Sequence, residues 1–548
     1  MKRSIKNIIV VTLLAVTTAC SDFLEIDNPS AVTDDLYNTK DGQEKLLADI
    51  YAKYRNVFNT GELQYYGTDL YLAITESPDE RMFNGYDASF NSTAGVVGPY
   101  WRNLYKIVQE TNILLTRTTP ETEGMTEETF NSITGQGRFL RALAYYYLVE
   151  TFGPVPLYTE EQSEIITTTN RALESDIYTF LIAELEATVQ LLTWDVSQPG
   201  IAQKGAALQL LGKVYLTRAY KPYAQPGDFS MAAATLDKII DGADSPYALL
   251  DNYADVYDEN NQNNSEVIWA IQYGLDRNFS GSGNPQQAQF GFNIVALEPD
   301  LFDKVQKDYS AMSRFYWVNP KVHELFDNPL ADIRYDATFQ REFYVNHPDS
   351  DHLGELGIYF PRWNDSSGND MGALQYYPFE EEDEYVWYPQ STALPVLNTG
   401  SDRMPIIKKF KDTRIEWGGP GSREDVIFRL SGTYLLSAEA YLGAGNTATA
   451  IERINTLRKR AASTPSFIDQ MEVSSIDLDF ILDERARELL GEHDRWFHLK
   501  RTGKLIERAR SYNIFVQKYD NISHMHLVRP IPQDEINKVN GLTQNEGY

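Results

Sequence analysis

Residues 204–219 read KGAALQLLGKVYLTRA, and their apolar and small side chains recur at the spacing of one helix face. A second amphipathic run follows at 229–240. The pair contains Leu211-Gly212-x-x-Tyr215 and Ala232-x-x-x-Leu236, which are pieces of the tetratricopeptide pattern. In that pattern small residues let two antiparallel helices approach closely, so we expect a helical hairpin here.

The same pattern returns near the C-terminus, where two more helices are predicted. The first carries Tyr434, Ala438 and Tyr441, and the second carries Ala450, Ile451, Ile454, Leu457 and Ala461. Further amphipathic helices are expected at 46–54, 100–115 and 171–192, and a helix that is apolar nearly all round, and so buried, at 139–149. The predicted fold class is mainly α, a tetratricopeptide-like superhelix of helical hairpins.

Between about 245 and 421 the helical periodicity fades, and Gly, Pro, Asn and aromatic residues interleave. Residues 266–273 alternate like a short strand, whereas 281–289 and 364–372 are typical of loops. We predict a long irregular insertion with short strands between an N-terminal part, about 20–244, and a C-terminal helical part, about 422–548. Such an excursion is where binding residues tend to lie. A purely structural excursion is the alternative.

The N-terminus has the pattern of a secretory signal. A basic start at 2–6 precedes an apolar or small-residue run at 8–19, too short for the roughly 20 residues that a membrane-spanning helix needs. We predict a signal peptide over 1–19. Cys20 follows directly and resembles the lipidated cysteine of a bacterial lipobox, although Thr17 stands where Leu is commonest. The alternative is an ordinary signal with a free cysteine.

Composition excludes several classes of protein. The 548 residues hold 49 Lys and Arg against 78 Asp and Glu, for a formal charge of −29. Such an acidic surface repels phosphate backbones and anionic lipid, so we expect no nucleic-acid partner. With 42% hydrophobic and 23% charged residues, the chain is neither mainly disordered nor a polytopic membrane protein. One cysteine permits no intramolecular disulfide and no cysteine-based metal cluster.

No catalytic motif stands out. The seven histidines lack zinc-site spacing, and no nucleophile elbow, P-loop or Gly-rich dinucleotide loop is present. The densest carboxylate group lies at 483–494 and is interleaved with arginines. Glu484, Arg487 and Glu488 have the spacing of salt-bridged helix neighbours. We therefore predict a non-enzymatic protein without metal or cofactor, with a surface glycoside hydrolase as the alternative.

Aromatic residues outside helices point to ligand binding. Sugar rings present flat C–H faces that stack on Trp and Tyr, while their hydroxyls pair with Asp, Asn and Arg. Segment 65–90 offers these types together, and the insertion offers Tyr316, Trp317, Trp363, Tyr376, Trp387 and Trp417. With 35 tyrosines, many are expected to be half-exposed. The predicted ligand-binding residues are Asp79, Arg81 and Tyr86, with Trp317 or Trp363. For any single aromatic residue, packing in the core is the alternative.

Several segments together resemble the SusD/RagB family of outer-membrane lipoproteins. The N-terminal half contributes Cys20-Ser21-Asp22-Phe23-Leu24-Glu25, Asn28-Pro29, Phe139-Leu140-Arg141-Ala142 and Phe152-Gly153-x-Val155-Pro156-Leu157. The C-terminal half contributes Glu484-Arg485-x-x-Glu488-Leu489, Arg495-Trp496-x-x-Leu499-x-Arg501-x-Gly503, Pro530-Ile531-Pro532-Gln533 and Gln544-Asn545-x-Gly547-Tyr548. His498 stands where the family usually has Asp, and Glu546 where it has Pro; both departures concern local hydrogen bonding.

The resemblance implies a fold and a role. Members have a helical body of four tetratricopeptide-like units and an irregular excursion that supplies much of the ligand surface. They lie on the cell surface, lipid-anchored to the outer membrane, and cover a SusC-like TonB-dependent transporter as a lid. They bind oligosaccharides without cleaving them and pass them on for import; some relatives bind peptides. A scaffold that binds only its transporter is a further alternative.

Overall fold

The computed structural model describes residues 34–73, 78–291, 294–303, 309, 316–363, 371–377, 380–382, 385–387, 405–417 and 419–548. The predicted signal peptide, 1–19, and Cys20 lie outside these ranges. Helices dominate the described chain and the strands are short, which confirms the predicted fold class. None of the described helices combines the length and the apolar character needed to cross a membrane.

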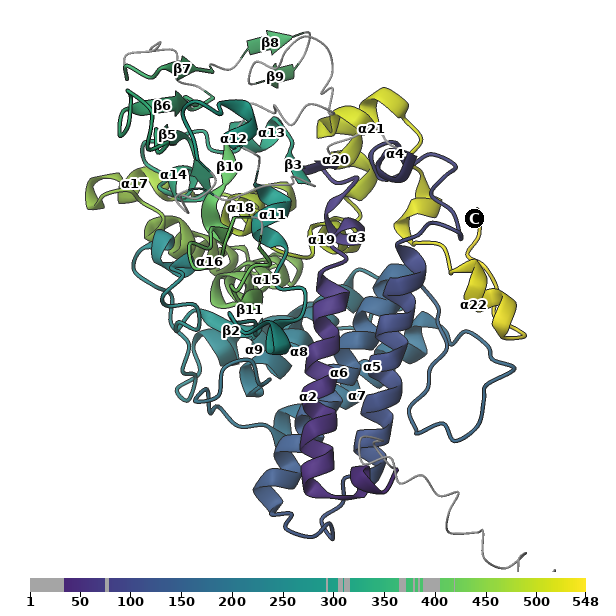
Figure 1. Cartoon of the computed structure of the whole chain (residues 1–548). Helices are drawn as coiled ribbons and strands as arrows, with labels where there is room; N and C mark the ends of the chain where they lie inside the picture. Colours follow the sequence, from purple (N-terminus) through teal and green to yellow (C-terminus); the bar gives the residue numbers. More distant parts are fainter. Residues whose placement is uncertain are drawn as a thin grey trace, which may run out of the picture.

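The N-terminal helices form one continuous array. They are α2 (Lys40–Phe58), α5 (Val97–Arg117), α6 (Glu127–Phe152), α7 (Glu174–Leu191), α8 (Lys204–Ala219) and α9 (Asp228–Ile240). Each packs against the next one in this order, and Figure 1 shows the long helices α2, α5, α6 and α7 side by side. A short 3-10 helix η1 (Asp34–Asn38) lies against the ends of α2 and α5.

The array continues across the insertion. Helix α15 (Leu430–Gly443) packs against α9, although the two are far apart in the chain, and it also contacts α16 (Thr447–Arg460) and α18 (Leu478–Leu489). Strands β2 (Val267–Ile271) and β11 (Asp425–Arg429), near the two ends of the insertion, pair antiparallel. The chain therefore leaves the helical body and returns to nearly the same place.

Two glycines explain how the helices fit together. A Cβ atom on Gly212 of α8 would lie 2.6 Å from the Leu236 side chain of α9, so the close approach expected for this hairpin depends on the missing side chain. Helix α6, with side chains 139–149 fully or nearly fully buried, ends before Gly153, whose φ of 72° lies in the left-handed region that favours glycine.

Short elements make up the insertion, in the teal and green upper part of Figure 1. Its helices are η2 (Tyr253–Tyr257), α10 (Arg277–Ser280), α11 (Gln286–Phe290), α12 (Ile294–Leu297), α13 (Lys321–Glu324), α14 (Arg334–Thr338) and η3 (Lys408–Phe410). Its strands after β2 are β3 (Tyr316–Val318), β4 (Phe339–Gln340), β5 (Glu342–Tyr344), β6 (Leu356–Tyr359), β7 (Gln375–Tyr376), β8 (Glu380–Glu382), β9 (Tyr385–Trp387) and β10 (Ile406–Ile407).

The insertion strands form small separate sheets. The larger one has the order β5-β6-β7, with β6 and β7 parallel, while β8 pairs with β9 and β10 with β4. The strand expected at 266–273 is β2. The loop expected at 281–289 is partly wrong, because α11 begins at Gln286, where the Asn284 side chain accepts a bond from the backbone N–H of Gln286. Most of the loop expected at 364–372 lies outside the described residues.

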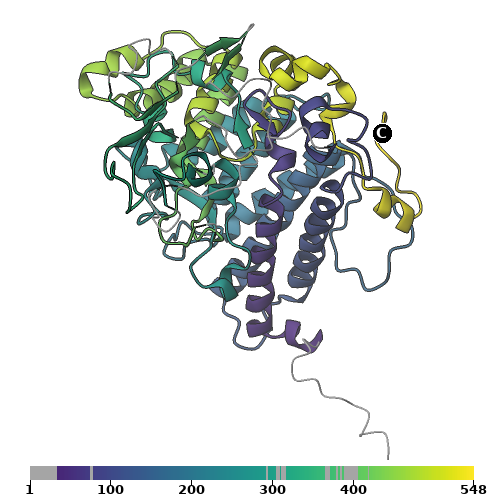
Figure 2. The ribbon, with the colours of Figure 1, turned by 45° about the horizontal axis from the view of Figure 1, so that its top comes forward.

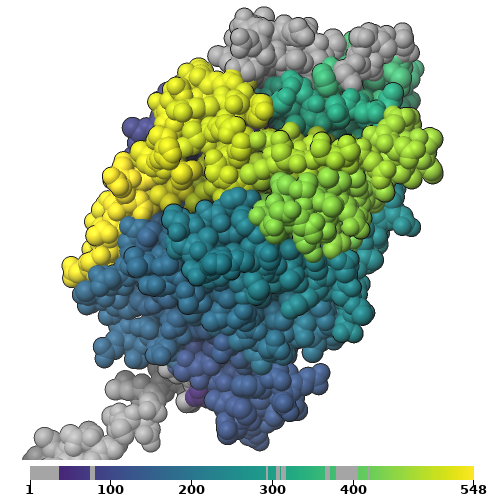
Figure 3. Space-filling model, turned by 180° about the vertical axis from the view of Figure 1, so that it is seen from behind, coloured from purple at the N-terminus to yellow at the C-terminus, as the bar shows by residue number. Residues whose placement is uncertain are grey.

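The C-terminal segment returns to the N-terminal helices. After η4 (Pro465–Phe467) and α17 (Ile468–Met471), it forms α19 (Arg495–Arg501), α20 (Leu505–Tyr512), α21 (Ile514–Tyr519), η5 (His524–Leu527) and α22 (Gln533–Lys538). Helix α19 contacts α3 (Glu62–Tyr65), α21 contacts α4 (Pro78–Gly85), and α22 contacts α5. Figures 2 and 3 show this yellow segment along one side of the blue helices.

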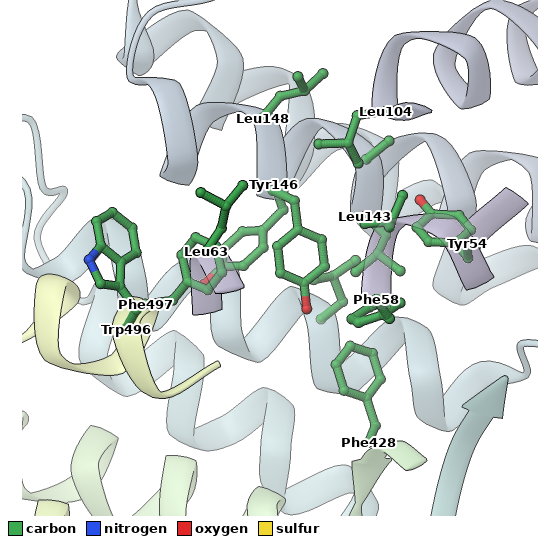
Figure 4. Packing of buried hydrophobic residues seen from close by; sticks show 14 of the residues in the cluster. Tyr54, Phe58, Leu63, Leu104, Leu143, Tyr146, Leu148, Phe428, Trp496 and Phe497 are labelled. Atoms are coloured by element: carbon green, nitrogen blue, oxygen red, sulfur yellow. The ribbon is translucent and has the colours of Figure 1, made fainter. Parts of the chain in front are cut away.

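One large core joins these parts. It holds side chains from α2, α5, α6, β11 and α19, among them Phe58, Leu104, Tyr146, Phe428 and Trp496, which lie near one another in Figure 4. A second cluster, which includes Leu72, Trp317 and Phe343, joins side chains of β1 (Tyr71–Ala73), of the insertion strands and of α21. Burial of both clusters fixes the insertion on the helical body.

Candidate ligand-binding site

The two predicted sources of aromatic residues meet in the structure. Strand β1 (Tyr71–Ala73) pairs antiparallel with β3 of the insertion, so that Leu72 lies opposite Trp317. Helix α4 packs against β1. Segment 65–90 and the insertion are therefore neighbours, as a shared binding surface requires.

Most of the aromatic rings gathered at this junction are interior. The six aromatic residues of segment 65–90 are each at most 2% exposed; they are Tyr65, Tyr66, Tyr71, Phe83, Tyr86 and Phe90. Tyr65 packs on Tyr316 with ring centroids 4.8 Å apart, and its hydroxyl donates to the Gly491 carbonyl at 3.2 Å. The expectation of a half-exposed aromatic platform in this segment is therefore wrong, because distant parts of the chain cover the rings and bond their hydroxyls.

Two of the predicted ligand-binding side chains are buried. Tyr86 is 2% exposed, its hydroxyl donates to the Gly67 carbonyl at 2.8 Å, and burial raises the pKa of this hydroxyl. Trp317 is 1% exposed and belongs to the second core cluster, with Leu72 and Phe343. In this conformation neither ring presents a face to solvent on which a sugar could stack, so both stabilise the fold.

Arg81 and Trp363 reach the surface. Arg81, on α4, is exposed, and its Nε lies 3.0 Å from a carboxylate oxygen of Asp87. Trp363, after β6, is half-buried, and its Nε1 donates to the Phe326 carbonyl at 3.3 Å. We group these two residues with Asp79 and call the three of them the insertion surface. The backbone of Asp79 lies in α4, and its side chain is outside the described part of the chain. No contact between Arg81 and Trp363 is found among the described residues.

A separate groove in the described chain has a volume of about 540 Å³. It lies between α5, the loop 156–169 and the C-terminal segment around α22; Figure 1 shows that loop beside α22. We call it the α5 groove. Its lining residues are Trp101, Arg102, Tyr105, Lys106, Val108, Gln109, Asn112, Pro156, Tyr158, Gln162, Ser163, Glu164, Ile165, Ile166, Thr169, Glu535, Val539 and Leu542.

Hydrogen bonds hold the walls of the α5 groove. The Tyr105 hydroxyl donates to the Pro156 carbonyl at 2.8 Å, and Asn112 Nδ2 donates to the carbonyls of Tyr158 and Glu160, each at 3.0 Å. The far end of the loop pairs with the C-terminal segment through the backbone N–H of Thr169 and the carbonyl of Asn540, 2.8 Å apart. The groove is therefore shaped before any ligand arrives.

The lining of the α5 groove is both aromatic and polar. The rings of Tyr105 and Tyr158 lie in T-shaped contact 6.0 Å apart, while Lys106 and Gln109 are exposed on α5. Arg102 Nη1 lies 3.3 Å from Glu535 Oε1 across the groove. These are the residue types that bind sugars, but the sequence analysis missed them. The available signal was Trp101 and Tyr105 four residues apart, with Arg102, Lys106 and Gln109 between and beyond them.

The dense carboxylates at 483–494 serve the scaffold. Glu484 is fully buried and lies 2.7 Å from Arg334, and 2.9 Å from both Arg458 and Arg487. Burial opposes ionisation, but these guanidinium groups outweigh it and lower the pKa of Glu484 to about 2. The ion pair between Glu484 and Arg487 confirms the predicted salt-bridge role. A buried carboxylate that stays ionised cannot act as a general acid at neutral pH.

Comparisons with known proteins agree on one family. A model described as the SusD family matches residues 265–548, and one described as starch-binding and associating with the outer membrane matches residues 22–216. SusD-like protein P25 of Formosa agariphila is 25% identical, covering 97% of this chain and 96% of that protein. The starch-binding protein SusD of Bacteroides thetaiotaomicron is 27% identical, covering 90% and 86%.

Solved structures show the same fold. A laminarin-binding SusD-like protein superposes with a TM-score of 0.68 at 24% identity, covering 93% of this chain and 100% of that one. A SusD homologue from Bacteroides thetaiotaomicron gives a TM-score of 0.73 at 18% identity, covering 95% and 100%. At these identities the likeness is one of fold.

Proposed function

Because this chain belongs to the SusD family, we propose that it is a lipid-anchored protein of the outer-membrane surface that binds oligosaccharides without cleaving them. It then passes them to a SusC-like TonB-dependent transporter. The observation that carries this proposal is the match along nearly the whole chain to relatives named for binding starch and laminarin. The burial of the densest carboxylate group in ion pairs supports binding over hydrolysis.

Polysaccharide retention tests the binding role. Purified protein run through native gels containing starch, laminarin or other polysaccharides should be retarded by at least one of them. Incubation with the retained polysaccharide should release no reducing ends. New reducing ends would favour the hydrolase alternative. Retention by no polysaccharide, together with binding of peptides, would favour a peptide-binding member of the family.

The transporter partner needs its own test. Affinity purification of the protein from outer membranes of its native host should recover a TonB-dependent barrel. Absence of such a barrel, under conditions in which glycan retention persists, would contradict the handover. Recovery of the barrel without any glycan or peptide binding would instead support a scaffold that binds only its transporter.

For the glycan itself we place the contact at the insertion surface. Arg81 offers hydrogen-bond donors and Trp363 a half-buried ring, and the pairing of β1 with β3 brings α4 to the insertion that carries Trp363. Replacing both residues by Ala should weaken binding at least about tenfold, which corresponds to roughly 1.4 kcal/mol. Lys45→Ala, a change at an exposed position on α2, is the matched control and should leave binding unchanged.

The α5 groove is the second candidate, favoured by its volume of about 540 Å³ and its aromatic and polar lining. Lys106→Ala combined with Gln109→Ala removes two exposed polar groups without touching the bonds that hold the loop. Lost retention in this variant, with normal retention after the Arg81 and Trp363 changes, would move the glycan site to the groove. Unchanged retention of the groove variant, with lost retention after the Arg81 and Trp363 changes, would leave the insertion surface as the site.

A further inference from the structure

A small buried cavity lies away from both candidate surfaces, where α8, β11, α15, α18 and α19 meet. Its volume is about 40 Å³. Among the residues that line it, six with charged side chains or an imidazole ring matter here: Lys213, Arg429, Arg485, Glu492, Asp494 and His498. Each of these six side chains is at most 8% exposed. A single water needs about 10–15 Å³, so the cavity has room for a few waters or one small ion.

Arg485 differs from the other cations around this cavity. Lys213 forms an ion pair with Asp494, and Arg429 Nε lies 2.7 Å from Glu492 Oε2. Arg485 is 3% exposed, yet it forms no ion pair with any described carboxylate, and its Nε and Nη1 have no hydrogen-bond partner. Its guanidinium group forms one hydrogen bond among the described residues, from Nη2 to His498 Nε2 at 3.0 Å.

The groups near Arg485 do not supply a free negative charge. The two carboxylates that act on it are already paired: Glu439 is held by Arg501 at 2.6 Å, and Asp494 forms its ion pair with Lys213. Burial and the surrounding cations place the pKa of His498 well below its usual range, so its imidazole is neutral and accepts the bond from Arg485. Burial and the Arg501 charge lower the pKa of Arg485 to about 9, because they outweigh the attraction of the paired carboxylates of Glu439 and Asp494.

A buried cation without a counter-charge is strongly unfavourable, and arginine does not escape by losing its proton. We propose that a small monovalent anion of the halide class, chloride under ordinary conditions, occupies this cavity and accepts hydrogen bonds from Nε and Nη1 of Arg485. Water would satisfy these donors but would leave the charge uncompensated. The volume excludes phosphate esters and glycans. The ion would link α18 to α19, α8 and α15 as part of the scaffold.

Thermal unfolding in matched salts tests the chloride site. Chloride is exchanged for gluconate at constant ionic strength, and the Tm of wild type should be higher in chloride by about 2 °C, since only the folded state holds the ion. His498→Asp places a carboxylate beside Arg485, so its Tm should no longer respond to chloride. His352→Asp, at an exposed position, should keep the wild-type response.

Bromide gives a second readout that does not depend on any variant. Crystals of wild-type protein soaked in bromide should show an anomalous peak in the cavity, within hydrogen-bonding reach of Arg485 Nε and Nη1. A cavity containing only ordered water, with equal Tm values in chloride and gluconate, would overturn the proposal. A chloride response that persists in His498→Asp would overturn it as well, because the ion would then bind elsewhere.

Discussion

At Glu484 one carboxylate meets three guanidinium groups that come from different parts of the chain. Arg334 belongs to the insertion, Arg458 to α16 and Arg487 to α18 itself. Arg334 also reaches Glu488 at 3.1 Å and thereby ties the insertion to the C-terminal helices. Buried ion pairs of this kind contribute little net stability when whole, but they are costly to break, because one charge is then left without a partner.

Glu484→Gln should therefore destabilise the protein by about 3–5 kcal/mol. The amide keeps the shape of the side chain but removes the charge that three guanidinium groups share. Urea unfolding followed by circular dichroism measures the change. Glu507→Gln is the matched control, because Glu507 is 62% exposed in its pair with Lys504 and should change stability by less than about 0.5 kcal/mol. Equal effects of the two variants would contradict the prediction.

Acid should act through the same carboxylate. The folded pKa of Glu484 is about 2 against an ordinary value of 4.5, so its stabilising contribution is complete above pH 4.5 and is lost as the pH falls towards 2. The loss amounts to roughly 3 kcal/mol. The unfolding free energy measured between pH 5 and pH 2.5 should fall less steeply for Glu484→Gln than for wild type. Parallel curves for the two proteins would show that Glu484 does not contribute.

For single residues, the sequence predicted an ion pair between helix neighbours but not the burial of aromatic side chains. The spacing of Glu484 and Arg487 predicted their ion pair, because neighbours on one helix face are fixed by local geometry. The burial of Tyr86 and Trp317 could not be predicted in this way, because residues far away in the chain cover them. The departure at His498 was expected to affect hydrogen bonding, and the structure shows Arg485 without a carboxylate beside it.

Among the elements, helices were the most predictable part of the fold. Helix α8 spans Lys204–Ala219, as expected, and the hairpin of α15 and α16 is present, because a 3.6-residue period is a property of the sequence itself. The α5 groove was not predictable, because its walls come from α5, a loop and the C-terminal segment, which only the tertiary structure brings together.

The α8–α9 hairpin offers a test of close helix packing. Gly212→Val should destabilise the protein by about 1–3 kcal/mol, because its Cβ would lie 2.6 Å from the fully buried Leu236 side chain, which cannot move without disturbing the core. Chemical denaturation measures the change. Gly95→Val is the control: a Cβ there has no neighbour within 4 Å, so its stability should stay near that of wild type. A stable Gly212→Val protein would mean that the two helices can separate at little cost.

On the scale of the whole molecule, the helical array is built from two distant parts of the sequence. The packing of α15 on α9 continues the stack of N-terminal helices, and the insertion projects from this junction without interrupting it. The pairing of β2 with β11 closes the base of the insertion. A rigid body with an excursion tied down by buried charges suits a protein that holds a ligand at its surface. Loops of such an excursion can vary while the scaffold stays the same.

Net charge decides how such a body can stay at a membrane. With a formal charge of −29, it gains no electrostatic attraction to anionic lipid, so we expect the proposed lipid on Cys20 to attach it. Cys20→Ala should move the protein from the outer-membrane fraction to the soluble fraction and abolish labelling by radioactive palmitate. Glycan retention by the purified variant should be unchanged, because Cys20 is not part of the proposed ligand surface. Membrane association of Cys20→Ala that resists high salt would contradict the anchor and indicate that a protein partner alone holds the molecule in place.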